Sequence, residues 1–377
     1  MASSAADFFR RHGLSEDDRL TCQQLANPVL PIRRSEDTPF PQGQCSYTVF
    51  VRDDATLAEH SAASRGCVVQ FRPTHFALDL EITRNAKIVY SELAPTVRWH
   101  RNICFKSGIG GDVILHMYSI ERIEGVPYSI IQPHTRDLPS ALLSRQALLV
   151  RDFARFIARS WTASQSETFS RLAEGKVGSC IEEKLQNLTE QLPSLNLRHH
   201  ARRTLEKLPR VNKLPIVLNH GDVVPSNIMV DKGTGHLNGL VDWAEAEYLP
   251  FGVCLYGLEY LLGFIDDNAA APCFSYYTLA LELREMFWGE LQSCIPALDD
   301  PQTLEAVKEA SNVGVLLWHG FAWDDGAIDR VVDRENDPLE VHLLEMFFAS
   351  SITHARHDSF VDAEGSAKAT GKGCVDA

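Results

Sequence analysis

Residues 214–243 read LPIVLNHGDVVPSNIMVDKGTGHLNGLVDW and carry the strongest structural pattern in the chain. An apolar run, 214–219, is followed by a polar loop and a second apolar run, 227–230. The glycine-containing turn 231–236 leads into a third run, 237–241, so the last two runs are expected to pair as a β-hairpin. This stretch therefore predicts a strand, a loop and a hairpin in direct succession.

Three polar side chains of this stretch suit phosphoryl transfer. If the turn centres near Thr234, Asn227 lies opposite Val241 and is therefore close to Asp242. An amide oxygen beside a carboxylate can bind Mg²⁺ together with nucleotide phosphates and water. Asp222, in the loop before the hairpin, can accept the proton of an attacking hydroxyl. We expect Asp222 to be the catalytic base and Asn227 and Asp242 to be the metal ligands.

The motif His220-Gly221-Asp222 with Asn227 five positions after Asp222 can also arise in an ordinary turn. From composition alone, this four-residue pattern is expected in on the order of one chain in a thousand. Asp242 at hairpin distance makes a chance occurrence rarer still. His220 is counted with the catalytic residues, although we expect it to orient the loop rather than to react. The motif favours a kinase, because phosphoryl transfer depends mainly on positioning and charge neutralisation.

Composition and charge narrow the class of protein. The 377 residues suffice for two domains, and 45% hydrophobic with 23% charged residues is ordinary for a globular protein. The net charge of −14 argues against a nucleic-acid partner. No apolar run is long enough to span a membrane, and the N-terminus lacks the apolar core of a signal peptide. With nine scattered cysteines and no C-x-x-C pair, the expected location is the cytoplasm. Oligomeric state cannot be read from the sequence.

Hydrophobic periodicity predicts a sheet-rich first part and a mostly helical second part. The expected strands are 47–51, 67–71 and 113–120, and the expected helices are 78–93, 276–294, 302–324 and 338–352. The charged segment 163–208 is expected to form a helical insert or cap. The predicted domains are a helical extension, a small sheet domain with one helix, a larger helical domain and a disordered tail, at 1–35, 36–124, 125–355 and 356–377.

The motif 220–230, together with Val241-Asp242-Trp243-Ala244, resembles the signature of the aminoglycoside phosphotransferase/choline kinase-like family. The continuation to Gly252 is similar to the fungal members of that family. This resemblance implies an α+β, bilobal protein-kinase-like fold, with a small antiparallel-sheet lobe and a larger helical lobe. It also implies transfer of the γ-phosphoryl group of ATP to a small-molecule hydroxyl. In the same way it implies that Asp222 is the base and that Asn227 and Asp242 hold Mg²⁺.

The resemblance also implies nucleotide contacts in the small lobe. The segment 42–47, with Gly43 and Ser46, occupies the place of the phosphate-covering loop, although it has a single glycine. Gln70 or Arg72 would contact the phosphates, and both point to the same face of a strand. Glu81 on the following helix is the expected ion-pair partner. Residues 121–127, including Glu121 and Ile123, resemble the hinge that bonds the adenine.

The acceptor is expected to be a small molecule that can carry an amine or another cation. Acidic candidates for its recognition are Glu245, Glu247, Asp266, Asp267, Asp324 and Asp325, each of which can equally be a surface carboxylate. Aromatic candidates are Phe287, Trp288, Trp318 and Trp323, whose helical spacing also suits the core.

Two alternatives to a small-molecule kinase stay open. The single-glycine loop and the unresolved choice between Gln70 and Arg72 leave room for a nucleotide-binding or inactive pseudokinase-like scaffold. A protein kinase is disfavoured, because the chain has neither a His-Arg-Asp nor an Asp-Phe-Gly motif.

Overall fold

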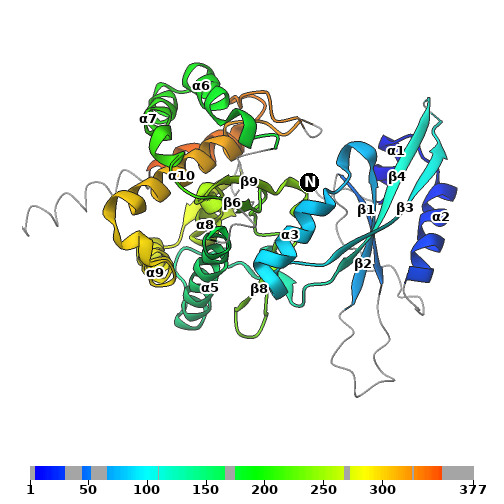
Figure 1. Ribbon diagram of the computed structural model, residues 1–377, viewed down its shortest axis with the longest axis horizontal. Coiled ribbons are helices and arrows are strands. Elements are labelled where there is room, and N and C mark those ends of the chain that lie inside the picture. The colour runs from blue at the N-terminus through cyan, green and yellow to red at the C-terminus, as the bar shows by residue number, and fades with distance from the viewer. Residues whose placement is uncertain are drawn as a thin grey trace, which may run out of the picture.

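The computed structural model describes residues 5–29, 45–51, 66–108, 110–165, 175–266, 272–324 and 327–349. Several sequence predictions fall outside these ranges, namely those for Gly43, Asp267, Asp325 and the tail 356–377. The described chain forms a sheet-based small lobe and a helical large lobe (Figure 1). The expected α+β, two-lobed fold class is therefore confirmed.

The small lobe is an antiparallel sheet of four strands in the order β1-β2-β4-β3. Its strands are β1 (Tyr47–Val51), β2 (Cys67–Pro73), β3 (Val97–Lys106) and β4 (Asp112–Glu121). The expected strands 47–51, 67–71 and 113–120 are confirmed. The sequence did not predict β3, because this strand lies at the sheet edge with mostly exposed, polar side chains and so lacks apolar alternation.

Two N-terminal helices, α1 (Ala5–Arg11) and α2 (Glu16–Ala26), pack beside this sheet (Figure 1). Ser15 and Asp18 form a reciprocal capping box that starts α2, because each side chain accepts a bond from the other residue's backbone N–H. Phe8 is fully buried and its ring stacks near Tyr47 of β1. The apolar faces of both helices thus join the core of the sheet.

Helix α3 (Leu80–Tyr90) lies between the two lobes and contacts the large lobe (Figure 1). Asp79 caps its start by accepting bonds from two backbone N–H groups. The Tyr90 hydroxyl donates to the Leu218 carbonyl at 2.7 Å, and its ring stacks on Phe156 of the large lobe. The expected helix 78–93 is therefore present but begins two residues later, and a short 3-10 turn (Ser91–Leu93) ends it.

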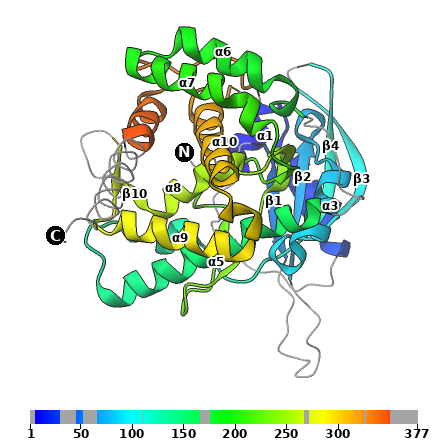
Figure 2. The same cartoon turned by 60° about the vertical axis from the view of Figure 1, so that its left-hand side comes forward.

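The large lobe packs helices around several short strands (Figures 1 and 2). Its helices are α4 (Tyr128–Ile131), α5 (Ser140–Ser164), α6 (Ile181–Gln191), α7 (Leu195–Val211), α8 (Gly257–Leu261), α9 (Ala280–Cys294), α10 (Pro301–His319) and 338–349. Its strands are β5 (Val126–Pro127), β6 (Ile216–Asn219), β7 (Ile228–Val230), β8 (Leu237–Leu240), β9 (Glu247–Pro250), β10 (Gly263–Asp266) and β11 (Cys273–Tyr276). No helix of the described residues has the length and apolar character needed to cross a membrane.

Two predicted helices of this lobe have different bounds from those expected. The segment 276–294 becomes helical only at Ala280, because residues 273–276 pair with β10. The segment 302–324 stops being helical at His319, and the chain turns back so that Phe321 bridges Val331. The expected cap 163–208 contains α6 and most of α7, which ends at Val211, and both helices pack on α10 (Figure 2).

Candidate active site

The loop after β6 is held in place by one buried amide and one glycine. The Asn219 side chain donates to the carbonyls of Val217 and Leu249 and accepts a bond from the Cys254 N–H. Gly221 has φ 76°, and a Cβ at this position would lie 1.8 Å from the Glu245 carbonyl oxygen. Only glycine fits there, so the chain can turn sharply between His220 and Asp222.

Asp222 projects from this loop toward the hairpin. Asn227 Nδ2 donates to Asp222 Oδ2 at 2.8 Å and to the Asp222 carbonyl at 3.1 Å. Burial raises the pKa of Asp222 to about 7, and the nearby charge of Asp242 adds to that rise while the Asn227 bond opposes it. The structure thus brings the predicted base and both predicted metal ligands to one place.

His220 joins the loop to the end of the hairpin. Its Nδ1 accepts a bond from the Asp222 N–H at 3.2 Å, and its Nε2 lies 2.9 Å from the Val241 carbonyl. These partners require the neutral tautomer with the proton on Nε2. Burial lowers the pKa of His220 to about 4, so the ring stays neutral at ordinary pH. These bonds support an orienting role, because they leave neither ring nitrogen for a reaction.

The hairpin has the register that the sequence predicts at its open end. The Val241 N–H donates to the Asn227 carbonyl at 3.0 Å, and Ile228 pairs with Leu240. Asp242 follows in a left-handed conformation, φ 61° and ψ 70°. Such a conformation costs a non-glycine residue of order 1–3 kcal/mol and is commonly kept at functional sites. It directs the chain into the turn Trp243–Glu245.

Arg72 is the small-lobe residue that reaches this centre. Its side chain is almost fully buried, and Nη2 donates to Asp242 Oδ1 at 2.9 Å. Its Nε donates to Gln70 Oε1 at 2.9 Å, so Gln70 supports Arg72 from the same face of β2. Both sequence candidates therefore belong to one arrangement, and Arg72 supplies the positive charge.

The other described residues predicted to contact the nucleotide lie at the ends of small-lobe elements. Ser46 is buried directly before β1, and Ile123 is buried after β4. Glu81 is exposed near the start of α3, and Arg72 forms an ion pair with Asp242.

Glu121 makes structural contacts at the end of β4. Its carboxylate pairs with Lys87 at 2.9 Å and accepts bonds from the Thr96 N–H and hydroxyl. Burial opposes ionisation of Glu121, but these bonds outweigh it and lower its pKa to about 2. The Glu121 N–H also donates to the Thr96 carbonyl at 2.8 Å, so both its side chain and its N–H have partners in the small lobe.

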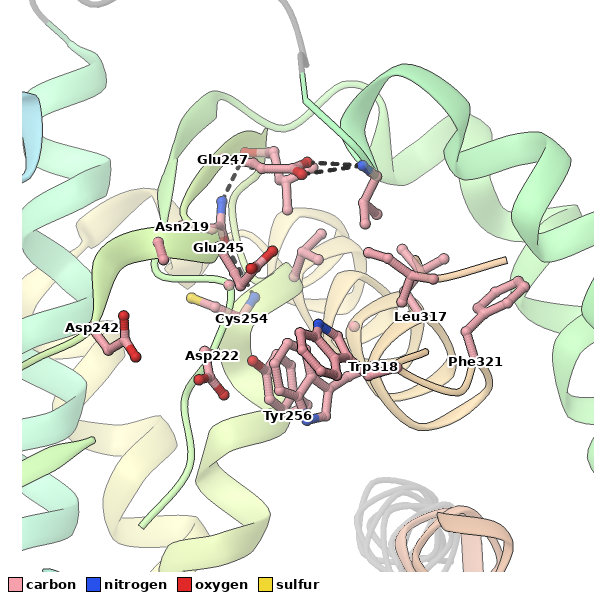
Figure 3. A pocket seen from close by; sticks show the side chains of 18 of the residues that line it. Asn219, Asp222, Asp242, Glu245, Glu247, Cys254, Tyr256, Leu317, Trp318 and Phe321 are labelled. Atoms are coloured by element: carbon pink, nitrogen blue, oxygen red, sulfur yellow. Dashed lines mark hydrogen bonds between the residues drawn. The ribbon is translucent and has the colours of Figure 1, made fainter. Parts of the chain in front are cut away.

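Asp222 and Asp242 open onto a cavity of about 520 Å³. In Figure 3 the two carboxylates stand on one side of the cavity, and Leu317 and Phe321 stand on the other. The apolar part of the described lining consists of Val177, Ala244, Leu249, Val253, Tyr256, Leu317, Trp318, Phe321, Ala322, Trp323 and Ile328. This volume is in the range of small-molecule sites, which extend from roughly 300 to 1,000 Å³.

Some of the residues predicted to contact the acceptor line the cavity, and others do not. Glu245, Glu247, Trp318 and Trp323 line it, whereas Phe287 is buried in the large-lobe core with Trp288 packed against that core. Asp266 and Asp324 are not among the described lining residues. The lining contains Cys45 of the predicted phosphate-covering segment 42–47, and it also contains residues that the sequence did not single out, such as Tyr256, Phe321, Asp337 and Glu340. These come from separate elements and share no spacing, so no local pattern marks them.

The chain is similar to solved kinase structures of low sequence identity. One is the aminoglycoside phosphotransferase APH(3'')-Id from Streptomyces rimosus ATCC10970, with 15% identity, coverage of 71% of this chain and 89% of that chain, and a TM-score of 0.38. A second is the Plasmodium vivax ethanolamine kinase, with 11% identity, coverage of 84% and 85%, and a TM-score of 0.48. A third is the choline kinase from Cryptosporidium parvum Iowa II, with 11% identity, coverage of 80% and 86%, and a TM-score of 0.44.

A family model extends over much of the chain. No curated protein matches the chain significantly. The model of the phosphotransferase enzyme family, APH, matches residues 38–253, which is more than half of the 377 residues. The matched segment contains Arg72, Asp222, Asn227 and Asp242. The chain therefore belongs to the APH phosphotransferase enzyme family.

Proposed function

We propose that this protein is a small-molecule O-phosphotransferase that moves the γ-phosphoryl group of ATP to a hydroxyl of a small metabolite. One observation carries the proposal. The Asp222 carboxylate, held by Asn227, faces a cavity of about 520 Å³ that Asp242 and Arg72 also line. A base, a carboxylate ligand and a cation thus line a space large enough for a small acceptor, and the second proposed oxygen ligand, Asn227, is bonded to the base.

Asp222 is proposed as the general base because of its position. Its Oδ2 is held by Asn227, and its own N–H is held by His220, so the carboxylate has a defined direction. A base must lie within hydrogen-bond reach of the proton that it takes. An acceptor hydroxyl in the cavity could approach the remaining lone pairs of the Asp222 carboxylate.

The residues at this end of the cavity fit Mg²⁺. Asn227 points its amide nitrogen at Asp222, which leaves its Oδ1 for a cation. With the Asp242 carboxylate this makes two oxygen donors, the kind and number of protein ligands that Mg²⁺ commonly takes alongside phosphates. Mg²⁺, when bound, neutralises the charge of the nucleotide phosphates.

Arg72 is proposed to face the same phosphates from the small lobe. It is buried, and its guanidinium is already oriented by Gln70 and Asp242. Ser46 and the hinge around Glu121 and Ile123 are proposed to contact the nucleotide, as the family resemblance implies. An amine on the acceptor would be favoured by the acidic lining only where those carboxylates are available to it.

The test is magnesium-dependent ADP release over a panel of alcohols, amino-alcohols and sugars. We expect at least one acceptor to stimulate release, and Asp222→Asn to abolish the stimulation while ATP with Mg²⁺ still raises the melting temperature. Asp112→Asn, an exposed change on β4, is the matched control. ATP binding without turnover across the panel would instead favour the pseudokinase-like scaffold. Equal activity of the parent and Asp222→Asn would overturn the proposal.

A further inference from the structure

In the half of the cavity away from Asp242, two stacked aromatic side chains form a wall, and one of them is hydrogen-bonded to the residue after the predicted base. Tyr256 and Trp318 stack with ring centres 4.9 Å apart and planes 12° apart, and both line the cavity (Figure 3). The Tyr256 hydroxyl accepts a bond from the Val223 N–H at 2.9 Å. Because Val223 directly follows Asp222, the aromatic wall has a defined position relative to the base.

Glu247 fastens another apolar part of the lining. Its carboxylate accepts bonds from the backbone N–H groups of Lys176 at 2.7 Å, Val177 at 3.0 Å and Gly178 at 2.9 Å. In the pair β6–β9, Glu247 lies opposite Asn219, the residue before His220. Val177 lines the cavity, so Glu247 links this apolar residue to the strand that carries the catalytic loop.

Lys184 of α6 holds a further apolar part of the lining. Its Nζ donates to the Ile328 carbonyl at 2.6 Å and lies 4.7 Å from the centre of the Phe321 ring. Both Ile328 and Phe321 line the cavity. The ammonium group of this mostly buried lysine is thus directed at the protein, and its contacts hold two apolar residues in place.

The carboxylates that line this half also have protein partners. Glu245 pairs with Lys176 at 3.3 Å. Asp337 accepts two bonds from Arg330, and Glu340 accepts a bond from His319 Nδ1 at 2.6 Å. Together with Glu247, these are the carboxylates other than Asp222 and Asp242 among the described residues that line the cavity. A cationic acceptor would therefore compete with these protein groups for the carboxylates. An apolar acceptor would instead contact the apolar lining without displacing any hydrogen bond.

We propose that the acceptor is an alcohol with a flat, apolar body, received against Tyr256 and Trp318 with Val177 and Ile328 around it. The inference rests on the proposed phosphotransferase function and names its substrate class. In the reaction the hydroxyl oxygen bonds to the γ-phosphorus, and the bond from that phosphorus to the β–γ bridging oxygen breaks. The hydroxyl proton passes to Asp222, and ADP leaves with the bridging oxygen.

The test compares four probes: 2-phenylethanol, tryptophol, choline and kanamycin. Calorimetry with Asp222→Asn measures binding without turnover, and ADP release with the parent measures kcat/KM. We expect the two aromatic alcohols to bind and to react at least about tenfold better than choline or kanamycin, since burying an aromatic group contributes about 1.4 kcal/mol or more. Binding or turnover that favours choline or kanamycin, or no binding of either aromatic alcohol, would overturn the inference.

Variants of the lining sharpen this test. Trp318→Ala should weaken tryptophol binding about tenfold, and Trp318→Phe should restore most of it. Glu247→Gln keeps the volume but presents an NH₂ group to backbone donors, so it should raise KM for the alcohol and leave KM for ATP unchanged. Glu183→Gln, on the exposed face of α6, is the matched control. Equal effects of Glu247→Gln on both KM values, or no effect of Trp318→Ala, would contradict the proposed subsite.

The two levels of proposal fail in different ways. If choline or kanamycin is phosphorylated in preference, the apolar acceptor class is wrong while the phosphotransferase function stands. If tryptophol binds and Trp318→Ala weakens that binding, but no acceptor in any panel stimulates ADP release, the subsite stands and the phosphotransferase function is wrong.

Discussion

The two sides of the catalytic centre are built in different ways. On the large lobe, His220, Asp222 and Asn227 bond to one another or to backbone atoms at most 21 positions away. On the small lobe, Arg72 reaches the centre through a bond to Asp242, which lies 170 positions away in the chain. The geometry of the predicted base is therefore a local property. The placement of the positive charge depends instead on how the two lobes meet.

Asp242 belongs to both sides, so changing it should have the largest effect. Asp242→Asn removes one proposed metal ligand charge and the ion-pair partner of Arg72. We expect kcat to fall about 10²–10³-fold, the usual cost of losing a preorganised charge at a reacting centre. Steady-state ADP release at several Mg²⁺ concentrations measures this, with Asp112→Asn as the control. Unchanged kcat at saturating Mg²⁺ would remove Asp242 from the proposed metal site.

Arg72 tests the long-range side alone. Arg72→Met removes its charge and its bonds to Gln70 and Asp242. We expect KM for ATP to rise about tenfold, equivalent to about 1.4 kcal/mol, with a smaller change in kcat. Arg72→Lys should give a KM for ATP between those of the parent and Arg72→Met, because lysine keeps the charge but lacks the planar guanidinium group. The exposed Arg98→Met on β3 is the control, and a KM equal to the parent's would contradict the proposed phosphate contact.

His220 tests the local side. His220→Ala leaves the Asp222 N–H and the Val241 carbonyl without their present partner. Two lost bonds should lower the free energy of unfolding by about 2 kcal/mol and lower kcat by a few-fold, while KM for ATP changes little. Urea unfolding and ADP release measure the two effects, with the exposed His199→Ala as the control. If His220→Ala changed KM for ATP as much as Arg72→Met does, the large-lobe and small-lobe sides of the catalytic centre would not have separate roles.

Glu121 and Lys87 should give the smallest effect, through pH. The pKa of Glu121 is lowered from 4.5 to about 2 in the folded protein. A carboxyl with a depressed folded pKa contributes stability that is fully present above its unfolded pKa and is lost as pH falls through the folded value. Lys87→Met should therefore destabilise the protein above pH 4.5 and progressively less as pH falls toward 2.

Urea midpoints of the parent and Lys87→Met, compared at about pH 6 and about pH 3, measure this change. The exposed Arg84→Met on the same helix is the control. A stability difference that stays constant between the two pH values would mean that the Lys87–Glu121 pair does not cause the lowered pKa.

Much of the large-lobe side could be predicted from the sequence. The turn and the apolar runs around it set the pairing of Asn227 with Val241, because hairpin register depends on a few adjacent residues. Strand β3 was missed because an edge strand need not alternate apolar and polar side chains. The left-handed conformation of Asp242 had no sequence signal, since its residue type is not glycine.

The sequence by itself determined the family signature, the succession of strand, loop and hairpin, and the closeness of Asn227 to Asp242. Only the tertiary structure decided that Arg72 meets Asp242, and that Tyr256, Trp318 and other separate residues line one cavity. The physical reason is the range of the interactions. Hairpin pairing is specified by neighbours in the chain, whereas contacts across lobes exist only after both cores have packed.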